Sequence, residues 1–173
     1  VEFELLKAEI SKLSLGTIAS LVGRYYGNDR DRRYVERTKI AYDLLTQGVG
    51  EKSDDFGAGA QAWYLKAPDR QSTDYYIHPL KSPQFQPIRE DDVVVGINFR
   101  SDRMVQIVRA LEDPNFTEFP RPVPDFRVVV VDVEFHPQFL ESRTEFVQVL
   151  RLNLELFIRL VPPNRIRIDV HGG

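Results

Sequence analysis

The sequence has 173 residues, a formal net charge of −3 and no cysteine. This length suits a single domain, and the lack of cysteine excludes disulfides, thiol nucleophiles and cysteine-based zinc sites. A hydrophobic fraction of 42% is enough to bury a core. No apolar run approaches the roughly 18 residues that a membrane span needs, and the acidic balance argues against a surface devoted to nucleic acid.

The N-terminal quarter of the chain predicts two helices with a strand between them. Apolar residues at helical spacing begin at the first residues and stop at Gly16, which predicts a helix. The run of Ile, Val and Leu over 17–22 predicts a short buried strand, followed by a polar loop over 23–31. An imperfect apolar stripe over 34–47 predicts a second helix that Gly48 ends.

The middle of the chain combines an irregular stretch with the clearest strand. Residues 49–90 carry several prolines and glycines without clear periodicity, so only a short helix near 60–66 is expected there. The near-continuous apolar run over 92–99 predicts a strand covered on both faces. Ser101 has the chemistry of an N-cap and predicts a helix over 102–111.

The last third of the chain predicts two strands and a long helix. Prolines over 114–124 predict a loop, and β-branched residues over 126–133 predict a strand. An apolar stripe over 143–160 predicts a helix, and the alternation over 165–170 predicts an edge strand. Because helices separate the strands, we expect an α/β fold with a mostly parallel or mixed sheet of about four strands, sandwiched by helices.

Arginine dominates the basic residues, with 17 arginines against 6 lysines. Its planar guanidinium donates in pairs to carboxylate or phosphate oxygens. Two segments, the loop 23–31 and the strand-to-helix connection 98–103, each leave a buried strand, and ligands of open α/β sheets bind beyond the carboxyl ends of the strands. These loops carry four candidate anion-binding residues: Arg24, Arg30, Arg100 and Arg103.

Asp29 and Asp102 lie beside these arginines in the sequence and are candidates to hold the guanidinium groups in orientation without contacting the ligand themselves. A local alternative is that each arginine pairs only with its neighbouring aspartate on a solvated loop. A shared anion site requires the two loops to converge at one edge of the sheet, as their positions after strands predict.

Two groups of motifs carry a family resemblance over about residues 1–120. The first group lies at 17–26 (TIASLVGRYY), 29–31 (DRD), 41–42 (AY) and 48–51 (GVGE). The second group lies at 91–94 (DDVV), 98–103 (NFRSDR) and 109–111 (RAL). These motifs resemble the cofactor-independent, or 2,3-bisphosphoglycerate-independent, phosphoglycerate mutases. The chain departs from the family's pattern by one added residue around Arg33 to Val35 and by Asn28 in place of the usual methionine.

The resemblance implies a cytoplasmic isomerase of glycolysis that interconverts 3-phosphoglycerate and 2-phosphoglycerate through a phosphoserine. In that family the serine and two divalent metal ions, usually manganese, lie in a phosphatase-like domain, and an inserted α/β domain binds the substrate. The resemblance assigns residues 1–173 to the inserted domain, as a fragment of a larger two-domain enzyme. It places the four arginines named above on the substrate carboxylate and phosphate. We expect the chain alone to be inactive, with the phosphatase-like domain as its partner.

No metal ligand and no catalytic group is expected in this chain. Its three histidines, at positions 78, 136 and 171, have no spacing that suggests a two-metal site. The alternative function is a non-catalytic or redesigned scaffold that retains the fold and the arginines. Tyrosines such as Tyr25 and Tyr75 could stack on nucleic-acid bases, but the net charge favours packing at the rim of the cleft. Neither nucleic acid nor a membrane is an expected partner.

Overall fold

The computed structural model describes residues 2–13, 16–89, 92–98, 100–121, 127–132, 155–161 and 165–172. Within these residues the α-helices are α1 (Glu2–Leu13), α2 (Arg24–Gly27), α3 (Lys39–Gln47), α4 (Phe56–Lys66) and α5 (Ser101–Glu112). The other helical turns are the π-helical η1 (Tyr34–Thr38) and the 3-10 turns η2 (Asp69–Gln71) and η3 (Asp74–Tyr76). None of the described helices combines the length and the apolar character needed to cross a membrane.

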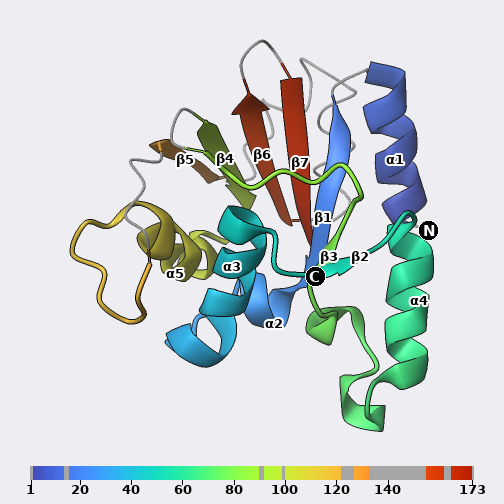
Figure 1. The fold of residues 1–173 in the computed structure, drawn as a ribbon, viewed down its shortest axis with the longest axis horizontal. Helices are drawn as coiled ribbons and strands as arrows, with labels where there is room; N and C mark the ends of the chain where they lie inside the picture. The colour runs from blue at the N-terminus through green and yellow to red at the C-terminus, as the bar shows by residue number, and fades with distance from the viewer. Residues whose placement is uncertain are drawn as a thin grey trace.

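One mixed sheet runs through the fold (Figure 1). Its strands are β1 (Thr17–Gly23), β2 (Glu51–Lys52), β3 (Leu80–Lys81), β4 (Val93–Asn98), β5 (Arg127–Asp132), β6 (Glu155–Val161) and β7 (Arg165–Gly172). The spatial order is β2-β3-β1-β7-β6-β4-β5. The pairs β1–β7, β4–β5 and β2–β3 are parallel, and the others are antiparallel. The predicted α/β class and mixed sheet are therefore confirmed.

The four predicted strands are all present, as β1, β4, β5 and β7. The edge position predicted for 165–170 is wrong, because β7 pairs with β1 on one side and with β6 on the other, and its local alternation cannot specify those long-range partners. The helix predicted over 143–160 is wrong at its C-terminal end, because 155–160 belong to β6; residues 143–154 lie outside the described residues. β6 is paired with β4 on one side and β7 on the other, and such long-range pairing overrides a local helical spacing. Together with the two-residue strands β2 and β3, it makes the sheet larger than expected, with seven strands among the described residues.

Two local predictions at the arginine loops need correction. The loop predicted over 23–31 opens with a helical turn, α2, directly after Gly23. Ser101 is the first residue of α5 rather than its N-cap, and the cap position is Arg100, whose backbone is extended. The backbone N–H of Arg100 donates to the side-chain oxygen of Asn98 at 2.8 Å, so the asparagine at the end of β4 organises this helix start.

The second predicted helix is confirmed, but it begins with the π-helical turn η1 before continuing as α3. A π turn holds one residue more than an α turn. This turn overlaps the positions around which the resemblance predicts an added residue. Gly48 ends α3 in the left-handed conformation, with φ 68°, which its sequence position predicts.

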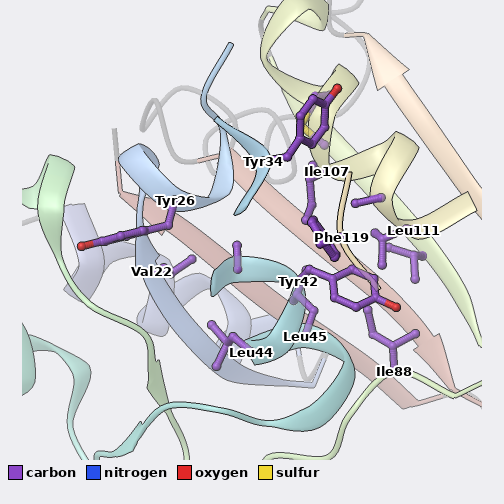
Figure 2. Packing of buried hydrophobic residues seen from close by; sticks show 14 of the residues in the cluster. Val22, Tyr26, Tyr34, Tyr42, Leu44, Leu45, Ile88, Ile107, Leu111 and Phe119 are labelled. Atoms are coloured by element: carbon purple, nitrogen blue, oxygen red, sulfur yellow. The ribbon is translucent and has the colours of Figure 1, made fainter. Parts of the chain in front are cut away.

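Helices cover both faces of the sheet and build two separate hydrophobic clusters. On one face, α2, α3 and α5 pack residues such as Tyr42 and Leu111 against Val22 of β1 (Figure 2). On the other face, α1 and α4 pack against Leu21, and Leu6 of α1 is fully buried in this cluster. Neighbouring residues of β1 thus point into different cores, which explains the continuous apolar run of this strand.

Candidate functional site

The two arginine loops begin at the same edge of the sheet. β1 is parallel to β7, and β6 is antiparallel to both β7 and β4, so β1 and β4 run in the same direction. The carboxyl end of β1 leads into α2, and that of β4 leads into α5 (Figure 1). The structure therefore has the convergence of loops that a shared site requires.

Asp102 joins one arginine from each loop. Nη1 of Arg30 donates to Oδ2 of Asp102 at 3.0 Å. Arg100 donates to the same carboxylate through Nη2 (3.1 Å) and Nε (3.3 Å). The Arg100–Asp102 pair agrees with the alternative in which each arginine pairs with the neighbouring aspartate on a solvated loop. Its carboxylate, however, also binds an arginine 72 residues away in the sequence, which local pairing does not predict.

The two guanidinium groups lower the pKa of Asp102. Desolvation is the largest single influence and acts in the opposite direction, but the hydrogen bonds and charges of Arg100 and Arg30 together outweigh it. The carboxylate is therefore ionised at neutral pH. Each guanidinium has five N–H donors, and Asp102 accepts one from Arg30 and two from Arg100. Both arginines keep further donors for an anion.

The other two predicted arginines stand on the helices that start at this edge. Arg24 is the first residue of α2, and its guanidinium carbon lies 4.8 Å from the centre of the Tyr75 ring. Arg103 lies in the first turn of α5, where its backbone N–H donates to the carbonyl of Arg100 at 3.1 Å. The structure thus places all four arginines on two adjoining segments, and their role in binding stays a prediction.

Asp29 binds an arginine other than the four predicted ones. Its carboxylate accepts a hydrogen bond from Arg37, and both side chains are buried, with exposed fractions of 6% and 8%. Arg37 also donates to Asp31 at 3.1 Å. Burial by itself lowers the pKa of Arg37, but the bonds to Asp29 outweigh it and raise that pKa, so the guanidinium stays charged.

Sequence reasoning missed Arg37. A usable signal exists, because Arg37 precedes the buried residues Ala41 and Leu44 by four and seven positions and so lies on the apolar stripe of the helix. A charged residue on a buried stripe requires a buried partner of opposite charge. The acidic residues of the preceding loop are the nearest candidates in the sequence.

Aromatic rings pack beside the arginines. Tyr25 contacts the rings of Tyr75 and Tyr76, with centroids 5.6 Å and 4.9 Å apart. The guanidinium of Arg37 lies over the Tyr25 ring at 4.0 Å, within the range of a cation–π contact. These contacts support the predicted role of the tyrosines in packing around the arginine loops.

The resemblance places its divalent metal ions in another domain, and the described residues of this chain do not fit such ions. Nowhere in the described part of the chain do three His, Asp or Glu side chains gather in a way that could hold a metal ion. The carboxylates at this edge, Asp29 and Asp102, are already engaged by cationic arginines. This edge has the donors of an anion site rather than the oxygen ligands that a divalent cation prefers.

A separate cavity of about 150 Å³ opens between α4 and the β2–β3 edge. Its wall includes Trp63 and His78, whose rings stack with centroids 4.3 Å apart. Burial lowers the pKa of His78, so this ring is neutral at physiological pH. None of the four predicted arginines lines this cavity, which is therefore distinct from the site at the strand ends.

Comparisons with known proteins identify the family of this chain. The family model described as "BPG-independent PGAM N-terminus" matches residues 2–136. A 2,3-bisphosphoglycerate-independent phosphoglycerate mutase of Pseudomonas entomophila is 40% identical over 119 residues, which are 68% of this chain and 22% of that protein. The protein of the same name from Thiobacillus denitrificans is 41% identical over 121 residues, 67% of this chain and 23% of that one.

A solved structure of a phosphoglycerate mutase also matches this chain. A crystal structure of Leishmania mexicana phosphoglycerate mutase at low cobalt concentration matches with a TM-score of 0.64 and 27% identity. The match covers 73% of this chain and 25% of that one. The chain thus spans about a quarter of the length of the proteins it matches. With the family model covering most of its length, the chain belongs to the N-terminus family of the BPG-independent phosphoglycerate mutases.

Proposed function

We propose that residues 1–173 form the substrate-binding domain of a phosphoglycerate mutase. In this proposal the domain binds 3-phosphoglycerate or 2-phosphoglycerate through its four site arginines, Arg24, Arg30, Arg100 and Arg103. The observation that carries the proposal is the meeting of Arg30 and Arg100, from two separate loops, on Asp102. A phosphoglycerate presents a carboxylate and a phosphate, and several guanidinium forks in fixed positions match that pair of groups.

In this proposal the chain binds and orients the substrate but does not transfer the phosphoryl group. The serine that forms the phosphoserine and the two divalent metal ions, manganese among the candidates, belong to a phosphatase-like domain that is the partner of this one. The length of the matched relatives and the anion-binding character of the arginine edge support this division. The enzyme as a whole would act in glycolysis, in the cytoplasm.

Retention of the substrate is the chemical contribution expected of the domain. Moving a phosphoryl group between neighbouring oxygens of one glycerate requires the glycerate to stay bound while it reorients. Donors held on two loops suit this task, because one loop can keep its contact while the other exchanges partners. The half-exposed side chains of Arg30 and Arg100, with exposed fractions of 59% and 49%, are accessible to a ligand.

An amide-resolved NMR titration with 3-phosphoglycerate, with inorganic phosphate in a parallel arm, tests the proposal. We expect shifts that cluster at 23–31 and 98–103 and that saturate more tightly for 3-phosphoglycerate. Arg30→Ala and Arg100→Ala should each weaken binding by about tenfold or more, because each removes charged hydrogen bonds to the ligand. Arg70→Ala, which removes an exposed arginine on η2, is the matched control and should bind as the unmodified chain does.

Two results would contradict the proposal. If the spectrum is dispersed but does not respond to 3-phosphoglycerate, the arginines form no substrate site, and a scaffold that keeps the fold without the function becomes the better description. If 3-phosphoglycerate and phosphate bind equally, the site recognises a lone phosphate and the substrate assignment is wrong.

A mutase assay on the isolated chain tests the division of labour between domains. Purified chain with added manganese should give no conversion of 3-phosphoglycerate to 2-phosphoglycerate above the buffer control. Measurable turnover that is lost in Arg100→Ala would show that this chain carries the chemistry itself.

A further inference from the structure

Arg37 binds the two residues that flank a site arginine. Its Nη1 donates to the carboxylates of both Asp29 and Asp31, which stand directly before and after Arg30. We propose that Arg37 is a positioning residue: with Asp29 and Asp31 it forms a clamp that holds the loop so that Arg30 reaches the anion site. This inference rests on the proposed function for its ligand, but the clamp itself is defined by contacts within the chain.

The loop around Arg30 needs such a support. The contact that Arg30 makes at the site is its ion pair with Asp102, and the exposed fractions of these side chains are 59% and 46%. Ion pairs this exposed are weak, because water screens them and ordering a long arginine side chain costs entropy. Arg32, two residues further on, has a positive φ of 54°, which is unfavourable for a residue other than glycine. A buried tie is therefore required to keep this conformation.

Arg37 is itself fixed from several directions. Its side chain is only 8% exposed, and its guanidinium stacks over the ring of Tyr25 at 4.0 Å. Thr38, the next residue, donates to Gln106 of α5 through a buried hydrogen bond of 3.2 Å. The clamp is thus tied to the helix that carries Asp102, and it sets the position of Arg30 relative to its partner.

The same guanidinium also supports the other arginine of this loop. Tyr25, on which Arg37 stacks, follows Arg24 in α2 and contacts the ring of Tyr75 at 5.6 Å. Arg24 in turn lies over the Tyr75 ring at 4.8 Å. Loss of the clamp is therefore expected to act mainly on Arg30, through Asp29 and Asp31, and more weakly on Arg24, through the rings.

Asp31→Asn weakens the clamp with the least damage, because it removes one of the two carboxylates that bind Arg37. The Asp31 side chain is 58% exposed, so removing its charge leaves no buried group without a partner. Any change of Arg37, in contrast, leaves the buried Asp29 without its partner. We expect Asp31→Asn to weaken 3-phosphoglycerate binding by about threefold to tenfold while the melting temperature stays close to that of the unmodified chain. Asp54→Asn, at an exposed aspartate before α4, is the matched control and should change neither.

A double-mutant cycle distinguishes positioning from a general electrostatic effect. If Asp31 acts through Arg30, Asp31→Asn should have little further effect on 3-phosphoglycerate binding in an Arg30→Ala background. Full additivity of the two substitutions, or unchanged binding in Asp31→Asn alone, would overturn the proposal. Asp31→Glu, which keeps the charge, should restore part of the lost affinity.

A measurement without ligand separates this proposal from the proposed function. The pKa of Asp102, followed by NMR, reports whether Arg30 stays in place, because Arg30 helps to lower it. In Asp31→Asn this pKa should rise toward its ordinary value, and in Asp54→Asn it should not. If the unmodified chain does not bind 3-phosphoglycerate, the proposed function fails, yet this pKa still decides on the clamp: an unchanged value in Asp31→Asn would refute it.

Discussion

The segment after β1 and the segment after β4 both carry site arginines, but their aspartates lie in different surroundings. Asp29, after β1, is buried and paired with the buried Arg37. Asp102, after β4, is 46% exposed and shares its carboxylate between Arg30 and Arg100. The charged groups of a buried pair have few other partners, so the pair holds the backbone in place. The groups of an exposed pair readily exchange each other for water or an incoming anion. Asp29 thus stabilises the loop, whereas Asp102 lies where an anionic ligand can compete with it for Arg30 and Arg100.

The largest expected effect breaks the buried pair. Arg37→Met removes the partner of Asp29 and leaves its carboxylate in a site that is 6% exposed. We expect the free energy of unfolding to fall by about 3–5 kcal/mol, as when one member of a buried pair is removed. Urea denaturation measures this loss. Arg109→Met, which breaks the exposed pair with Asp113 (3.2 Å), should cost far less; equal losses would mean that burial does not distinguish the two pairs.

The next effect concerns the backbone where the first loop begins. A Cβ at Gly23 would lie 2.5 Å from the carbonyl oxygen of Tyr75 and 2.6 Å from the nitrogen of Ile77, and backbone atoms cannot move aside cheaply. Gly23→Ala should therefore lower the free energy of unfolding by about 1–3 kcal/mol, the usual cost of overpacking. The control is Gly57→Ala in α4, where the nearest atom is a side-chain oxygen of Asp55 at 3.1 Å. It should be close to neutral, and an equal loss there would contradict the steric explanation.

These two regions also show what sequence reasoning can reach. The strands that lead into the loops are visible because their apolar runs are long and are buried on both faces, as Leu21 and Val22 show. The positions of the two loops can be predicted from the ends of these strands. The pairing of Arg100 with Asp102 can also be predicted, because the two residues are close in the sequence. The contact of Arg30 with Asp102 depends on the order of the strands, which no local pattern specifies.

The misses have the same physical origin. Strand β6 carries Leu156, Phe157 and Ile158 in succession, a short apolar run that fits a helix or a strand equally well until its neighbours are known. Strands β2 and β3 have two residues each and exist only because they pair with one another and with β1. The partner of Asp29 is missed because Arg37 lies eight residues further on, in the turn η1, whereas sequence reasoning considers only neighbouring residues.

The exposed pairs should matter little for stability. Arg30→Ala and Arg100→Ala each remove contacts to a half-exposed carboxylate, so the free energy of unfolding should change by less than about 1 kcal/mol. The same urea experiment measures this change, and the binding titration supplies the contrast. A loss comparable to that of Arg37→Met would show that the second loop is structural like the first, and the distinction between the two aspartates would fail.

The smallest effect is the pH dependence that Asp102 contributes. A carboxyl group whose pKa is lower in the folded chain adds stability above its unfolded pKa of about 3.9, and this contribution is lost as the pH falls through the lowered folded value. Asp102→Asn should therefore lose slightly less stability than the unmodified chain when the pH drops through that window. NMR titration of Asp102 should show the lowered pKa directly, with a rise in both Arg30→Ala and Arg100→Ala. A rise in Arg100→Ala alone would mean that Asp102 pairs only with its neighbour in solution, and the two loops would then lack the contact that makes them one site.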